Sequence, residues 1–62
     1  MKTMQVYFIY VYDSVRGWVK CNHHINPISG FEFEEDVIKA IVLHSTSTPE
    51  KEFTFMPIYK TI

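Results

Sequence analysis

Four side chains in this sequence have the chemistry of ligands for a soft or borderline metal ion: Cys21, His23, His24 and His44. In an extended strand alternate residues share a face, so Cys21 and His23 would point together while His24 points away. A zinc site needs three or four ligands in a tetrahedral array, and the sequence repeats no Cys or His spacing typical of such sites. We therefore expect no metal site and no cofactor, and interpret Cys21 as a small buried thiol beside a hydrogen-bonded imidazole.

The residue types of a nucleophile with a general base are also present. Cys21 or Ser14 would be the nucleophile, and His44 and Asp13 would complete the set. Such sets are defined by geometry, and the small sheet that this chain can form offers little cleft for a substrate. We interpret these residues as structural and predict that the protein is not an enzyme.

A cluster of carboxylates lies near the middle of the chain and consists of Glu32, Glu34, Glu35 and Asp36. The cluster adjoins the start of a predicted helix, where the positive end of the helix dipole stabilises negative charge. Two interpretations stay open. The carboxylates are either a solvated first turn or a docking patch for a basic surface of a partner protein.

Several aromatic side chains are candidates for exposure on a small sheet: Tyr7, Tyr10, Tyr12 and Trp18. Exposed aromatics stack on the bases of single-stranded nucleic acid in RNA-recognition modules. That function would need the basic residues Lys2, Arg16, Lys20 and Lys60. Stacking platforms normally work beside a positive groove, and the net charge of −1 provides none. Nucleic-acid binding is the alternative; contact with a protein, or with a second copy of this chain, is favoured.

Length and composition set the frame for these residues. A chain of 62 residues predicts one domain, residues 1–62, with a small core, and an aromatic fraction of 16% compensates by burying much area per residue. A single cysteine favours a reducing compartment, so we expect a cytoplasmic protein. No apolar run approaches the ~20 residues that a bilayer requires. The apolar run after Lys2 is rich in tyrosine and lacks a small-residue cleavage site, which argues against a signal peptide.

The stretch from Met4 to Tyr12 is β-branched and aromatic almost throughout, as in a heavily buried strand. Even-numbered positions carry Met4, Val6, Phe8, Tyr10 and Tyr12, and odd-numbered positions carry Gln5, Tyr7, Ile9 and Val11. Neither set is polar, which predicts a central strand covered on both faces. One predicted helix covers one face, so we expect the second cover to come from another molecule.

A polar segment ending in Gly17 predicts a hairpin after this strand. The second strand should run from Trp18 to about Ile25, with its odd-numbered residues toward the core, and should form an edge. Asn26 and Pro27 end it.

A helix follows, and its start has two candidates. Ser29 with Glu32 fits a capping box, and Ile28 with Phe33 has the spacing of a hydrophobic staple. Gly30 in the first turn argues instead for a start near Glu34. The inward stripe would consist of Phe33, Val37, Ala40, Ile41 and His44, and the helix should end near Ser45.

The last segment, Glu52 to Ile62, reads as a third strand in which Pro57 marks an edge or a bulge. The element order is β-β-α-β. It predicts an α+β fold with a three-stranded antiparallel sheet in the order 2-1-3 and one helix on one face.

These segments together resemble very small proteins encoded by bacteriophages and prophages. The matching pieces are Tyr7 to Tyr12, Gly17, Pro27-Ile28, Glu35 to Ile38 and Phe53 to Ile58. The resemblance implies an accessory viral protein that binds one host or viral protein, and transfers no site residues. We expect a non-enzymatic protein-binding module, such as an inhibitor of a host protein, that forms a homodimer or a tight complex through the aromatic residues or the acidic cluster.

Overall fold

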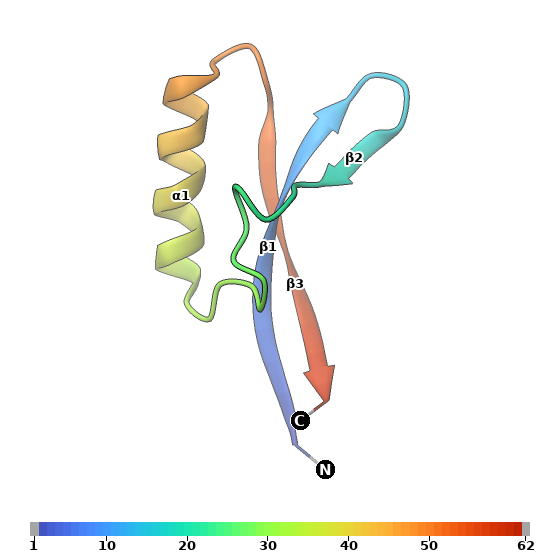
Figure 1. The fold of residues 1–62 in the computed structure, drawn as a ribbon, viewed down its shortest axis with the longest axis vertical. Coiled ribbons are helices and arrows are strands. Elements are labelled where there is room, and N and C mark those ends of the chain that lie inside the picture. Colours follow the sequence, from blue (N-terminus) through green and yellow to red (C-terminus); the bar gives the residue numbers. More distant parts are fainter. Residues whose placement is uncertain (1, 62) are drawn as a thin grey trace.

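The computed structural model describes residues 2–61, which form three strands and one helix. In chain order these are β1 (Thr3–Asp13), β2 (Gly17–Lys20), α1 (Glu34–Ser47) and β3 (Phe53–Thr61). The strands form one antiparallel sheet in the order β2-β1-β3. The helix lies along one side of the sheet, and the β1–β2 hairpin extends toward the other side (Figure 1). The predicted α+β fold, strand order and central first strand are confirmed.

The register of the long β1–β3 pair assigns every side chain of the sheet to one of two faces. Val11 lies opposite Phe53 and Val6 lies opposite Ile58. The ring of His44 in α1 is 6.2 Å from the ring of Phe53. The odd-numbered residues of β1 and β3 therefore form the helix face, and the even-numbered residues form the opposite face, here called the open face.

Four side chains of the core are buried on both sides of β1. Ile9 and Val37 are buried between the helix face and α1, whereas Val6 and Phe8 are buried on the open face. The cover of Val6 and Phe8 comes from the loop at Gly30, where an added Cβ would lie 3.0 Å from two ring atoms of Phe8. Gly30 also has φ +85°, which favours glycine. The prediction that the chain leaves this whole face uncovered is therefore wrong for the half around Val6 and Phe8.

The loop begins earlier than predicted because β2 ends at Lys20 rather than near Ile25. Asn22 turns the chain: its backbone carbonyl accepts hydrogen bonds from the N–H groups of Ile25 at 3.1 Å and Asn26 at 2.9 Å. Its side-chain oxygen also accepts the N–H of His24 at 3.0 Å. Such local bonds compete with strand pairing, which ends the strand although the alternating pattern continues.

The side chain of Asn26 takes the place of the missing strand residues beside Ile9. Its Oδ1 accepts the Ile9 N–H at 2.8 Å, and its Nδ2 donates to the carbonyls of Ile9 at 3.1 Å and Cys21 at 2.9 Å. Farther along the same edge, Tyr7 and Phe31 exchange two backbone hydrogen bonds of 2.8 and 2.9 Å. This edge of β1 is thus paired successively by β2, one amide side chain and one loop residue.

The helix begins at Glu34, so the start near Glu34 is confirmed and the start at Ser29 is wrong. Gly30 packs on Phe8 instead of entering a first turn, and Ile28 is 92% exposed, so no staple forms with Phe33. Within the predicted stripe, Val37 is buried but Phe33 is exposed. The helix ends at Ser47, two residues later than predicted. Within residues 2–61 no helix has the length and apolar character needed to cross a membrane.

Candidate interaction surface

Three of the four predicted aromatic residues meet on the open face. Tyr12 lies directly opposite Trp18 in the β1–β2 hairpin, and their rings pack edge to face with centroids 5.4 Å apart. Tyr10 follows on the same face of β1 because it is two residues away. Tyr7 does not belong to this group: it lies on the helix face, where its ring packs against Phe55 at 5.6 Å. Tyr7 is half-buried there, so it lies apart from the other three aromatic residues.

The exposed part of the open face is the half that the loop does not reach. Tyr12 is 49% exposed, Trp18 is 42% exposed and Met56, on the neighbouring strand β3, is 38% exposed. We define the aromatic patch as Tyr10, Tyr12, Trp18 and Met56. Met56 is a member that the sequence interpretation missed, although its even number placed it with Thr54 and Ile58 on this face.

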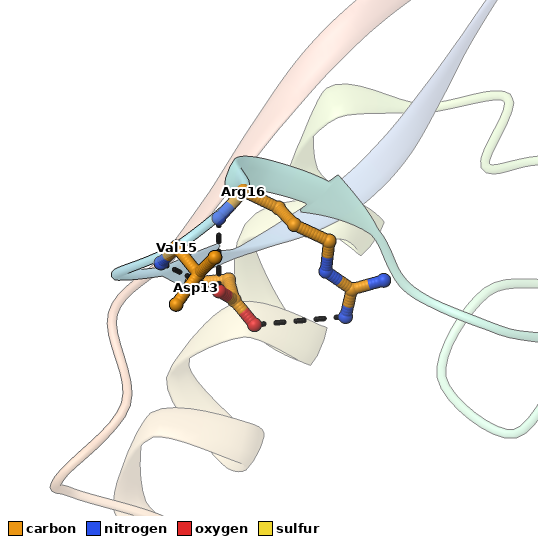
Figure 2. Close-up of polar contacts among 3 residues, drawn as sticks. All are labelled: Asp13, Val15 and Arg16. Atoms are coloured by element: carbon orange, nitrogen blue, oxygen red, sulfur yellow. Dashed lines mark hydrogen bonds and ion pairs between the residues drawn. The ribbon is translucent and has the colours of Figure 1, made fainter.

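The hairpin turn fixes the position of Trp18. The carboxylate of Asp13 accepts the backbone N–H groups of Val15 at 2.8 Å and Arg16 at 3.0 Å (Figure 2). These hydrogen bonds hold the pKa of Asp13 below its ordinary value. Gly17, with φ +80°, then returns the chain into β2. The turn therefore presents Trp18 and Tyr12 from a hydrogen-bonded frame rather than from a loose loop.

The basic side chains near the patch are engaged within the protein. The guanidinium of Arg16 lies 3.6 Å from the carboxylate of Asp13. The ammonium of Lys20 lies 3.8 Å from the centre of the Phe8 ring, and that of Lys60 donates to the carbonyl of Ser29 at 3.1 Å. These are three of the four cations that a nucleic-acid interface would require. Arg16 is paired with a carboxylate, whereas Lys20 and Lys60 contact neutral groups and keep their charges.

The acidic cluster lies apart from the aromatic patch, at the start of α1. All four of its members are exposed: Glu32, Glu34, Glu35 and Asp36. Within residues 2–61 none of them forms an ion pair. Glu32 and Asp36 also line a pocket of about 390 Å³ whose other walls include Met4, Val6 and Phe33. Two carboxylates of this exposed cluster therefore border an apolar hollow, which is compatible with either interpretation of the cluster.

The residues considered for metal or nucleophilic chemistry are not assembled into a site. The rings of His23 and His24 lie 4.3 Å apart, whereas His44 packs near Phe53. Across residues 2–61 no three His, Cys, Asp or Glu side chains come together to hold a metal ion. Burial raises the pKa of the Cys21 thiol, which lowers its reactivity as a nucleophile. Asp13 uses its carboxylate to hold the hairpin turn.

Within the described residues two surface features therefore stand apart: the aromatic patch at the hairpin and the pocket beside the first turn of α1. Comparisons of the chain with models of protein families, with curated proteins and with solved structures found no match.

Proposed function

We propose that the protein is a small non-enzymatic binding module that attaches to another protein through the aromatic patch. The observation that carries this proposal is the exposure of Tyr12 and Trp18 side by side on a hydrogen-bonded hairpin. Tyr and Trp dominate the binding energy of protein interfaces, because they bury large areas at a small cost in side-chain entropy. A pair held at a fixed distance before binding reduces that cost further.

The resemblance to small phage proteins suggests the class of partner. On that basis we propose an accessory viral protein that acts in the cytoplasm of the host cell and occupies the surface of one host or viral protein. Cys21 is half-buried and the pKa of its thiol is raised, and a single free cysteine of this kind is compatible with a reducing compartment. Binding at a surface of this kind modulates or inhibits the partner without turnover.

The chain offers a direct probe of this proposal, because Trp18 is its one tryptophan and lies in the patch. When a partner covers the patch, the emission of Trp18 should shift to shorter wavelength and acrylamide should quench it less. The measurement is made on the purified protein alone over a range of concentrations, and then with the protein captured from host lysate. A shift with the captured protein supports the proposal, and a shift with concentration alone identifies a second copy as the partner.

Two variants separate the patch from the remaining apolar surface. Tyr12→Ala, which keeps the Trp18 probe, should weaken the complex about 30-fold or more, as expected for a central aromatic contact worth about 2 kcal/mol. Val42→Ser, at a position that is 60% exposed on the outer side of α1, should leave the affinity unchanged. Equal effects of the two variants, or a captured protein that leaves Trp18 emission unaltered, would refute the assignment of the patch.

A further inference from the structure

The edge of β1 that faces β2 is left unpaired at its amino-terminal end. Along this edge, hydrogen bonds are made by odd-numbered residues: Tyr7 with Phe31, and Ile9 with Asn26 and Cys21. Backbone groups alternate in direction along a strand, so the N–H and C=O groups of Thr3 and Gln5 point to the same edge. Within residues 2–61 no strand or bridge pairs with β1 there, because pairing on this side ends at Tyr7 and Phe31.

The opposite edge of the sheet is protected in a way that this edge is not. Tyr7 directs its backbone N–H and C=O groups to Phe31. Pro57 lies opposite Tyr7 on β3, so these two residues form a pair that exchanges no backbone hydrogen bonds. The nitrogen of Pro57 therefore faces outward, and the outer edge of β3 lacks a donor at its centre. Proline at this position is a common protection against strand addition. Thr3 and Gln5 have no comparable protection.

A pocket adjoins the unpaired edge of β1. Its apolar walls are provided by Met4 and Val6 of β1 and by Phe31 and Phe33 of the loop, within a volume of about 390 Å³. Figure 1 shows that β1 and β3 continue past this loop as a two-stranded ribbon. A third strand added beside Thr3 and Gln5 would continue the line of Phe31, and side chains on one of its faces would enter the pocket.

The charge of the residues around this pocket indicates which kind of segment would bind there. Glu32 and Asp36 line it, Glu34 and Glu35 flank them on the first turn of α1, and none of the four is paired within residues 2–61. The lining also contains one cation, Lys60, whose ammonium donates to the Ser29 carbonyl, so the two carboxylates leave the lining with a net negative charge. A second copy of this chain at the same edge would bring a second acidic cluster close to the first, which electrostatic repulsion disfavours. A basic segment is complementary.

The geometry points to a second binding site, independent of the aromatic patch, that takes an extended basic peptide segment of another protein. The segment adds as a short antiparallel strand to Thr3–Gln5 of β1. It places one apolar side chain in the pocket between Met4, Val6 and Phe33, and its lysine or arginine side chains reach Glu32 and Asp36. Backbone hydrogen bonds supply affinity, and the pocket and the carboxylates supply selectivity.

A random heptapeptide library provides the probe for this site. Selection on the immobilised protein should enrich peptides with lysine or arginine on either side of an apolar residue, relative to the starting library. The enriched peptide is then titrated by fluorescence polarisation. Replacing both carboxylates, by Glu32→Gln with Asp36→Asn, should weaken it about tenfold and reduce its dependence on salt, since two charge pairs are lost.

Two proline variants test the strand addition itself. Gln5→Pro removes an outward N–H of the free edge and should weaken the peptide about tenfold or more, the equivalent of one lost hydrogen bond. Gln5 lies opposite Tyr59, so Tyr59→Pro makes the matching change at the outer edge of β3 and should leave binding unaltered. Both changes spare the bonds between β1 and β3, and circular dichroism verifies that each variant is folded. N-methylation of the Gln5 amide in a synthetic chain makes the same test with the side chain retained.

Several results would overturn the proposal. If the selection enriches no peptide, or only peptides without basic residues, a basic peptide is not the ligand of this site. Equal weakening by the two proline variants would show that the peptide does not add to the free edge of β1. A dimer that Gln5→Pro converts to a monomer would show that this edge binds a second copy of the chain. Tyr12→Ala should leave peptide binding intact, so failure at this site is distinguishable from failure of the aromatic patch.

Discussion

Replacing Asn26 with alanine should remove much of the stability of this protein, although the side chain is short and polar. Asn26 is 3% exposed, and its amide makes three hydrogen bonds to the backbone of Ile9 and Cys21. The Ile9 carbonyl would keep its bond from the Cys21 N–H at 3.0 Å. Alanine would therefore leave two groups without a partner, the Ile9 N–H and the Cys21 carbonyl.

The cost follows from those two groups. A buried backbone group without a partner costs about 1–3 kcal/mol, so the pair costs about 2–6 kcal/mol. Asn26 also lines a small open hollow of about 250 Å³, through which water reaches the vacated position and reduces the penalty. We expect about 2–3 kcal/mol. A domain of 62 residues has roughly 3–9 kcal/mol in total at about 0.05–0.15 kcal/mol per residue, so the variant should be close to unfolding.

Urea denaturation followed by circular dichroism measures this loss, and Asn22 provides the matched control. Asn22 lies in the same loop, but its side chain makes one exposed hydrogen bond, to the His24 N–H. Asn22→Ala should cost less than about 1 kcal/mol, because water replaces that bond. Equal midpoints for the two alanine variants would show that the amide does not substitute for a strand.

Asn26→Asp gives a second, independent readout. The carboxylate still accepts the Ile9 N–H but has no donor for the two carbonyls, and it places negative charge beside them. The variant should be less stable than the parent at neutral pH. It should regain part of the loss in acid, where the protonated carboxyl again offers one donor. Stability that falls on acidification by as much as in the parent would contradict this account.

Three further predictions use the same denaturation assay. Phe8→Ala should cost about 3–5 kcal/mol, because the ring is buried under the loop at Gly30, and a melt close to that of the parent would contradict it. Gly30→Ala should cost more than about 1 kcal/mol, since its φ of +85° is strained for alanine and the new Cβ would lie 3.0 Å from the Phe8 ring. The lowered pKa of Asp13 implies stability that is present above its ordinary value of 3.8 and is lost as the pH falls through the lower folded value. Asp13→Asn should abolish this part of the acid dependence, and an unchanged acid profile would show that the turn contributes nothing.

Much of the fold was predictable, because the decisive signals are local. The aromatic and β-branched composition of Met4 to Tyr12 identifies a central strand, and Gly17 identifies the turn after it. Pro57 identifies an edge. Alternation places Tyr10 and Tyr12 on one face of the first strand, and the hairpin register, with Tyr12 opposite Trp18, adds Trp18 to that face.

What the sequence does not contain is information about which groups meet across the fold. The alternation of Val19, Cys21 and His23 continues past Lys20, but local hydrogen bonds of Asn22 end the strand. In the sequence Asn26 reads only as the end of a strand, because nothing there shows that its side chain bonds the backbone of Ile9. Both faces of β1 are apolar, so the pattern does not tell that the helix covers the face of Tyr7 and not that of Tyr10 and Tyr12.

The long pairing of β1 with β3 has a consequence for folding during translation. Thr3 pairs with Thr61, and the register continues to Val11 opposite Phe53. The central strand therefore has no long partner until the 48 residues from Ser14 to Thr61 have been translated, which takes about 2–10 s at about 5–20 residues per second. In that interval the loop at Gly30 and α1 can already cover Val6, Phe8 and Ile9, but their strand still lacks its long partner, and pairings this distant in sequence form slowly. A chain truncated before β3 would leave the long edge of its most apolar strand unpaired, so we expect its yield in cells to depend on chaperones that bind extended apolar segments.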